Sequence, residues 1–111
     1  MRTCDECIYS GTVTETGNSG EFNVKGAGEI VLFLNVTEVS GTSPTLLMKF
    51  ITKDTIGNKW YLIEDFDSIS SPTSKIKRII GGLGSYIACR WVIGGTNNPS
   101  FTFTLNASIK D

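Results

Sequence analysis

The sequence of 111 residues contains no histidine. Histidine is the commonest general base of enzymes and the commonest ligand of transition metals, so its absence removes the usual centre of both chemistries. The sequence also lacks a nucleophile-elbow motif, a phosphate-binding loop and a dinucleotide-binding fingerprint. We therefore expect a protein that is not an enzyme and that uses no cofactor.

Charged residues are scarce, at 19% of the sequence against a usual share of about 25%. The formal net charge is −1, and the one basic cluster consists of Lys75, Lys77 and Arg78. This cluster lies in an alternating stretch, which is typical of the solvated face of one strand, and a weak contact with an anionic partner is the alternative. Nucleic-acid binding needs more clustered basic residues, so we expect no nucleic-acid partner.

Long apolar runs are missing as well. The longest, Ile30–Leu34, is far shorter than the roughly 20 residues that span a bilayer. The first residues, Met1–Glu6, lack the apolar core of a signal peptide. We expect no contact with a membrane, and synthesis in the cytoplasm.

The three cysteines are Cys4, Cys7 and Cys89. Cys4 and Cys7 form a C-x-x-C pair, which is half of a four-ligand zinc site, but no histidine and only one further cysteine is present to complete it. We therefore predict no metal and keep Cys4 and Cys7 as the candidate ligands, in a site completed by Cys89 and a carboxylate or by another subunit. A disulfide between them, or two free thiols, is the favoured interpretation. Cys89 is predicted to be a small core residue.

Strand signals, in contrast, are abundant. Apolar residues alternate with polar ones, as in Phe101, Phe103 and Leu105, and turn residues recur at short intervals. The pattern predicts an all-β domain, an antiparallel β-sandwich of about eight strands in immunoglobulin-like or jelly-roll order. The predicted strands are Ile8–Glu15, Glu21–Lys25, Glu29–Ser40, Thr45–Thr52, Lys59–Asp65, Lys75–Ile80, Ser85–Ile93 and Ser100–Ser108.

Two segments of the sequence, Val39–Leu46 and Ile93–Phe101, resemble each other. Each contains a strand end, Gly-Thr, one or two small polar residues, a proline and a new strand. Glycine permits a positive φ, and proline begins a strand without donating to the ladder. Two hairpin corners of one design would lie at matching positions of the fold. Such a repeat is consistent with two pseudo-equivalent halves, but convergent turn chemistry is the favoured interpretation.

The sequence predicts one domain with two parts. Residues 1–20 are predicted to form an amino-terminal arm and first strand that contacts a partner, and residues 21–111 the body of the sandwich. Trp60 and Tyr61 are adjacent, so on a strand they face opposite sides, and we expect one in the core and the other partly exposed. Exposed aromatic residues bind proteins or sugars, which makes Trp60 and Tyr61 the candidate partner-binding residues, although ordinary packing is the favoured interpretation.

The stretch Leu32–Leu46 resembles a segment of small structural proteins in the virions of tailed bacteriophages. Gly94–Thr104 is similar to their closing hairpin, and Gly57–Tyr61 also fits, so that the resemblance extends over Ile30–Leu105. The amino-terminal segment lies outside it. The resemblance consists of turn and strand patterns and implies a structural role without catalysis.

In such proteins the implied role is head decoration, in which a cement protein binds the major capsid protein or other virion proteins and stabilises the head lattice. A neck or tail component is the alternative. The resemblance also implies a homo-oligomer, with a trimer favoured, on the capsid surface of the virion. A carbohydrate-binding or other ligand-binding β-sandwich is a further alternative.

Overall fold

The computed structural model describes residues 3–24, 28–80 and 84–110, with side chains from residue 7 onward. These residues form strands and connecting loops, and none of them lies in a helix that is long and apolar enough to cross a membrane. The prediction of an all-β protein is confirmed. The strands are β1 (Thr3–Val13), β2 (Gly17–Asn18), β3 (Phe22–Asn23), β4 (Glu29–Asp54), β5 (Lys59–Asp65), β6 (Thr73–Ile80) and β7 (Tyr86–Lys110).

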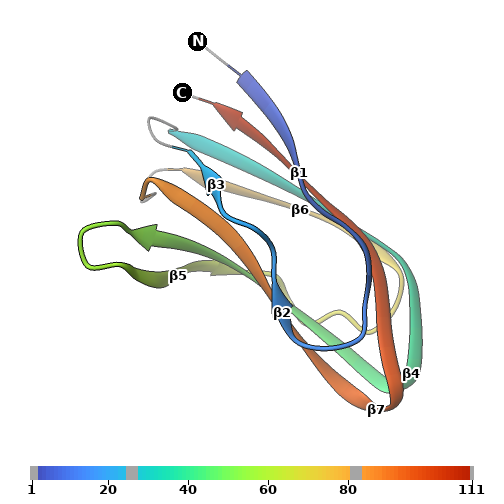
Figure 1. The fold of residues 1–111 in the computed structure, drawn as a ribbon. Coiled ribbons are helices and arrows are strands. Elements are labelled where there is room, and N and C mark those ends of the chain that lie inside the picture. The colour runs from blue at the N-terminus through green and yellow to red at the C-terminus, as the bar shows by residue number, and fades with distance from the viewer. Residues whose placement is uncertain (1–2, 25–27, 81–83, 111) are drawn as a thin grey trace.

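Two very long strands, β4 of 26 residues and β7 of 25 residues, dominate the fold. They pair with each other in antiparallel register from Glu29 opposite Lys110 to Lys53 opposite Tyr86. Figure 1 shows this ribbon of two strands bending back on itself at the lower right. Globular proteins usually have strands of about five or six residues, so each long strand takes the place of two ordinary ones.

The bend divides the ribbon into two sheets. In the first sheet, β1 lies beside the carboxyl-terminal half of β7, and β6 lies beside the amino-terminal half of β4. In the second sheet, β2 and β3 lie beside the other half of β7, and β5 lies beside the other half of β4. Each sheet therefore has the two ribbon strands at its centre and shorter strands at its edges.

This pairing decides between the two strand orders that the sequence left open. In an immunoglobulin-like sandwich the first strand pairs with the second. Here the first strand, β1, pairs with the last segment of the chain, from Thr3 opposite Lys110 to Val13 opposite Phe101. If each half of β4 and β7 is counted as one strand, and β2 with β3 as one strand, the chain has eight strands. Numbered along the chain, they have the order 1-8-3-6 across the first sheet and 2-7-4-5 across the second, which is the jelly-roll order.

The core lies between the two sheets and consists of alternate residues of each strand. Leu34 lies opposite Leu105 on the inner face of the first sheet, and Met48 lies opposite Trp91 on that of the second. The sheets meet where the ring centroids of Trp91 and Phe103 are 5.7 Å apart. The largest fully buried side chains are Phe50, Phe101, Phe103, Ile30, Leu32, Leu34, Leu46, Met48, Ile87, Leu105, Val36 and Cys89.

The two similar segments meet at the bend of the ribbon. Gly41 has a φ of +105°, and a Cβ placed there would lie 2.7 Å from the Cα of Pro99. Gly95 has a φ of +118°, and its Cβ would lie 2.9 Å from the Cα of Pro44. The segments occupy matching positions, as predicted. They are not hairpins, however, because β4 and β7 continue through the bend and remain partners on both sides of it.

The amino-terminal segment is part of the sandwich and not a separate arm. β1 begins at Thr3, earlier than predicted, and pairs along its length with β7. Ile8 and Val13 are buried in the core, and Gly17–Asn18 pairs with β7 in the second sheet. Deletion of residues 1–20 would therefore remove core side chains as well as an edge strand, so such a deletion does not isolate a binding function.

The paired bend generates a stability prediction. We expect Gly41→Ala to lower the free energy of unfolding by about 1–3 kcal/mol, because the residue needs a positive φ and its Cβ would meet the Pro99 backbone. Gly20→Ala is the matched control, since a Cβ at Gly20 meets no atom within 4 Å. Urea unfolding of both variants provides the measurement. Equal unfolding midpoints for the two variants would show that the bend does not depend on this contact.

Candidate functional site

Trp60 and Tyr61 lie on β5, at the edge of the second sheet. Trp60 is opposite Lys53 and Tyr61 is opposite Thr52 of β4. Tyr61 is 49% exposed and Trp60 is half-buried, so neither belongs to the core. The prediction that one of them is a core residue is wrong, because β5 is an edge strand that has β4 on one side only.

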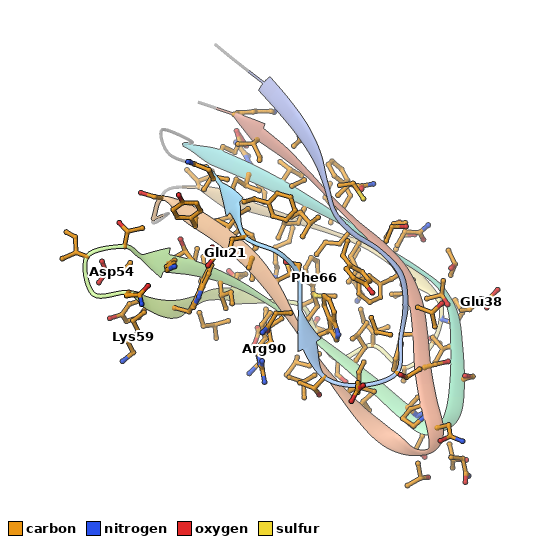
Figure 2. The ribbon with its side chains drawn as sticks, viewed as in Figure 1. Glu21, Glu38, Asp54, Lys59, Phe66 and Arg90 are labelled. Atoms are coloured by element: carbon orange, nitrogen blue, oxygen red, sulfur yellow. The ribbon has the colours of Figure 1, made fainter. Side chains whose placement is uncertain are left out.

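Trp60 lines a groove of about 380 Å³ on the outer face of the second sheet, which we call the Trp60 groove. Its floor is low because Ala88 lies on this face, opposite Ile51, where a larger side chain would fill the space. In Figure 2 the labelled Glu21 and Arg90 lie between the β2–β3 segment and β5. The residues that line the groove are Asn18, Ser19, Glu21, Ile51, Trp60, Ala88 and Arg90.

Hydrogen bonds hold the wall that the β2–β3 segment forms. The Ser19 backbone N–H donates to the Cys89 carbonyl at 2.8 Å, and the Cys89 N–H donates to the Ser19 hydroxyl oxygen at 2.9 Å. The Arg90 guanidinium donates to the side-chain oxygen of Asn18 at 3.0 Å. The segment is therefore attached to β7, and the groove has a defined shape.

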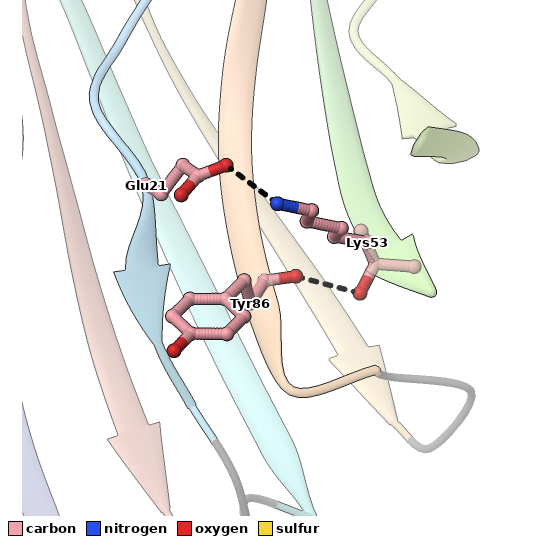
Figure 3. A network of polar contacts seen from close by, with 4 residues as sticks. Glu21, Lys53 and Tyr86 are labelled. Carbon is pink, nitrogen blue, oxygen red and sulfur yellow. Dashed lines mark hydrogen bonds and ion pairs between the residues drawn. The ribbon is translucent and has the colours of Figure 1, made fainter. Parts of the chain in front are cut away.

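An ion pair near the groove reaches across β7, from β4 to the β2–β3 segment. Lys53 Nζ lies 3.4 Å from a carboxylate oxygen of Glu21 (Figure 3). The same ammonium group lies 5.9 Å from the centre of the Trp60 ring. Beside this pair the Thr52 hydroxyl donates to the Tyr86 carbonyl at 2.9 Å. Within the described residues Arg90 takes part in no ion pair, so the groove keeps one positive charge that no carboxylate balances.

A second surface lies on the outer face of the first sheet. Phe33 of β4 and Ile76 of β6 are directly opposite each other and are 44% and 66% exposed. Ile80, further along β6, is 68% exposed. We call these three residues the apolar strip. These residues were not predicted as a surface from the sequence, because the charges of Lys75, Lys77 and Arg78 suggested a solvated strand face.

The basic cluster is divided between two faces. Lys77 points to the open side between the sheets, where its ammonium group lies 3.5 Å from Glu64 and donates to the Asp65 carbonyl at 2.7 Å. Arg78, at the next position, forms an ion pair with Glu29 on the outer face. The interpretation of all three charges as one solvated strand face is wrong, because successive residues of a strand face opposite sides.

Cys4 and Cys7 both lie within β1, opposite Ile109 and Asn106. Three residues of extended strand separate their Cα atoms by about 10 Å, whereas a disulfide requires less than about 7 Å. A disulfide between them does not fit this strand, and Cys7 is an exposed free thiol. The Cys4 side chain lies outside the described part of the chain. Within the described part, no three or more His, Cys, Asp or Glu residues lie close enough together to hold a metal ion.

No protein-family model matches the sequence, and no curated protein is significantly similar to it. The two surfaces described above are therefore interpreted from their own geometry and charge.

Cys89 lies in the core, as predicted, and its burial raises its pKa from 9.0 to about 12. The unfolded chain ionises this thiol at lower pH than the folded chain does. The contribution of the protonated Cys89 thiol to the free energy of unfolding is therefore complete below pH 9. It is lost as the pH rises toward 12, by about 1.4 kcal/mol per pH unit. We expect the unfolding free energy of the wild type to fall more steeply above pH 9 than that of Cys89→Ala. Parallel pH profiles from urea titrations would contradict this assignment.

Proposed function

We propose that this chain is a structural, non-enzymatic protein of a tailed-phage virion, and that it is a head decoration protein. It binds the major capsid protein on the capsid surface and stabilises the lattice. The proposal is supported by the position of the segments that carry the resemblance. Residues 32–46 and 94–104 form the bend of the ribbon and the strands next to it, on which the arrangement of both sheets depends.

The observation that carries the proposal is the apolar strip. A single exposed apolar side chain is ordinary on a protein surface, whereas a cross-strand pair with a third residue in line marks a contact surface. Burial of such side chains contributes about 25 cal/mol for each Å² of apolar area removed from water. Phe33 and Ile76 also border a groove of about 430 Å³, to which Thr104 and Asn106 of β7 contribute polar groups.

The charges around the strip favour a different protein over a second copy as the occupant. Two copies that paired along β6 would bring the basic residues of this strand, Lys75, Lys77 and Arg78, close to those of the other copy, and like charges at a strand edge oppose such pairing. Lys75 forms no ion pair within the described residues. A capsid surface with apolar groups surrounded by acidic ones complements this arrangement. A homotrimer on the head would then form through another surface.

The location of the protein tests the role. Virions of the encoding phage are purified, and the chain is detected by mass spectrometry and by immunogold electron microscopy. Label over the head supports decoration, and label over the neck or tail supports the alternative structural role. Absence of the chain from purified virions contradicts both.

Light scattering of the purified protein gives the oligomeric state, for which a trimer supports decoration and a larger ring supports a tail component.

The apolar strip makes a prediction for a single variant. We expect Ile76→Asp to abolish binding to expanded heads that lack the protein, because it places a charge in the buried contact. Leu62→Asp is the matched control, since Leu62 is 55% exposed on β5, an edge strand of the second sheet, and lies outside the strip. Binding is measured by co-sedimentation with the heads, and folding by thermal unfolding of each variant. Binding of folded Ile76→Asp at wild-type level would exclude the strip as the attachment surface.

A further inference from the structure

We propose that the Trp60 groove binds an acidic oligosaccharide, with a sugar ring against the Trp60 indole and a sugar carboxylate held by Arg90. The groove lies on the outer face of the second sheet, whereas the apolar strip lies on the outer face of the first. The inference therefore does not rest on the proposed role in the virion, and each can fail without the other.

The length of the groove fits more than one sugar unit. Trp60 is opposite Lys53, which in turn is opposite Tyr86, and Tyr86 precedes Arg90 by four residues of β7. At the usual rise per residue these four residues extend about 13 Å, so Trp60 and Arg90 lie toward opposite ends of the groove. Between them the floor is formed by Ala88 and Ile51, which leave the space that a chain of two or three sugars occupies.

The indole of Trp60 is placed to contact a sugar. It is half-buried on an edge strand and does not belong to the core. An aromatic side chain at such a place offers an apolar face that packs against the C–H groups of a sugar ring. Asn18 and Ser19, on the opposite wall, carry amide and hydroxyl groups of the kind that bond to sugar hydroxyls.

The charge of the groove favours an acidic sugar over a neutral one. Arg90 has five N–H donors, and within the described residues its guanidinium group makes one hydrogen bond, to Asn18. A guanidinium group matches a carboxylate with two parallel hydrogen bonds. Lys49, opposite Arg90 on β4, is also opposite Asp65 of β5, and Glu21 is already paired with Lys53, so Arg90 supplies the unbalanced positive charge of the groove. The same few charges are insufficient for tight binding of a nucleic-acid backbone.

The fluorescence of tryptophan provides a direct measurement. The sequence has two tryptophans, and the other one, Trp91, is buried in the core, so a change on titration reports Trp60. The probes are tri-galacturonate and sialyllactose, which carry carboxylates, with the methyl esters of the same saccharides as their neutral counterparts. We expect both acidic probes, or one of them, to bind, and the neutral probes to bind at least about tenfold more weakly.

Variants separate the two contacts. Arg90→Gln removes the charge and is expected to weaken binding of the acidic probe at least about tenfold. Arg90→Lys keeps the charge but cannot donate two parallel hydrogen bonds to a carboxylate, and it is expected to recover part of the loss. Arg78→Gln is the matched control on the first sheet and leaves binding unchanged. For Trp60→Ala, which removes the signal, binding is followed by amide chemical shifts of Ser19 and Ala88 in NMR spectra and is expected to be lost.

Three results would overturn the inference. The first is the absence of any fluorescence or chemical-shift change with both acidic saccharides. The second is equal affinity for an acidic probe and its neutral counterpart, or unchanged affinity in Arg90→Gln. The third is binding of an oligoglutamate peptide as tight as that of the acidic saccharides, which would make the groove a site for acidic peptides.

Discussion

The fold depends on one contact, the mutual packing of two bends in the β4–β7 ribbon. Gly41 lies against Pro99 and Gly95 lies against Pro44, so each bend provides the surface on which the other turns. Every other strand pairs with one of these two strands. If the ribbon continued straight, the apolar inner faces of its two halves would both be exposed to water. The bend brings these faces together, and the burial of their side chains stabilises the sandwich.

The same bend separates the two outer faces. The first sheet presents the apolar strip, and the second presents the Trp60 groove with its unbalanced positive charge. At the open side between β5 and β6, Lys77 bonds to Glu64 and to the Asp65 carbonyl, and its ammonium group lies 5.6 Å from the centre of the Phe66 ring. These contacts of Lys77 cover the edge of the core and join the two sheets. A scaffold of this kind can present two different surfaces to two different ligands.

Much of the fold could be predicted from alternation and turn residues. Each predicted strand overlaps an observed one, although β4 and β7 each join two predicted strands and β2 was not predicted. The burial of Cys89 was predicted as well. The errors concern contacts between distant segments. The amino-terminal residues were assigned to an arm because their partner, β7, lies at the other end of the chain. The Trp60 groove was missed because its walls come from β2–β3, β5 and β7.

Local sequence dictates which segments are strands and which side chains share a face, because both follow from the period of two. It also dictates where the ribbon bends, since glycines at positions 41 and 95 permit a positive φ and are followed by prolines. The jelly-roll order, the edge position of Trp60 and the ion pair of Lys77 with Glu64 follow from the tertiary structure alone. Each of these depends on which strand lies beside which, and that is set by burial of apolar area across long stretches of chain.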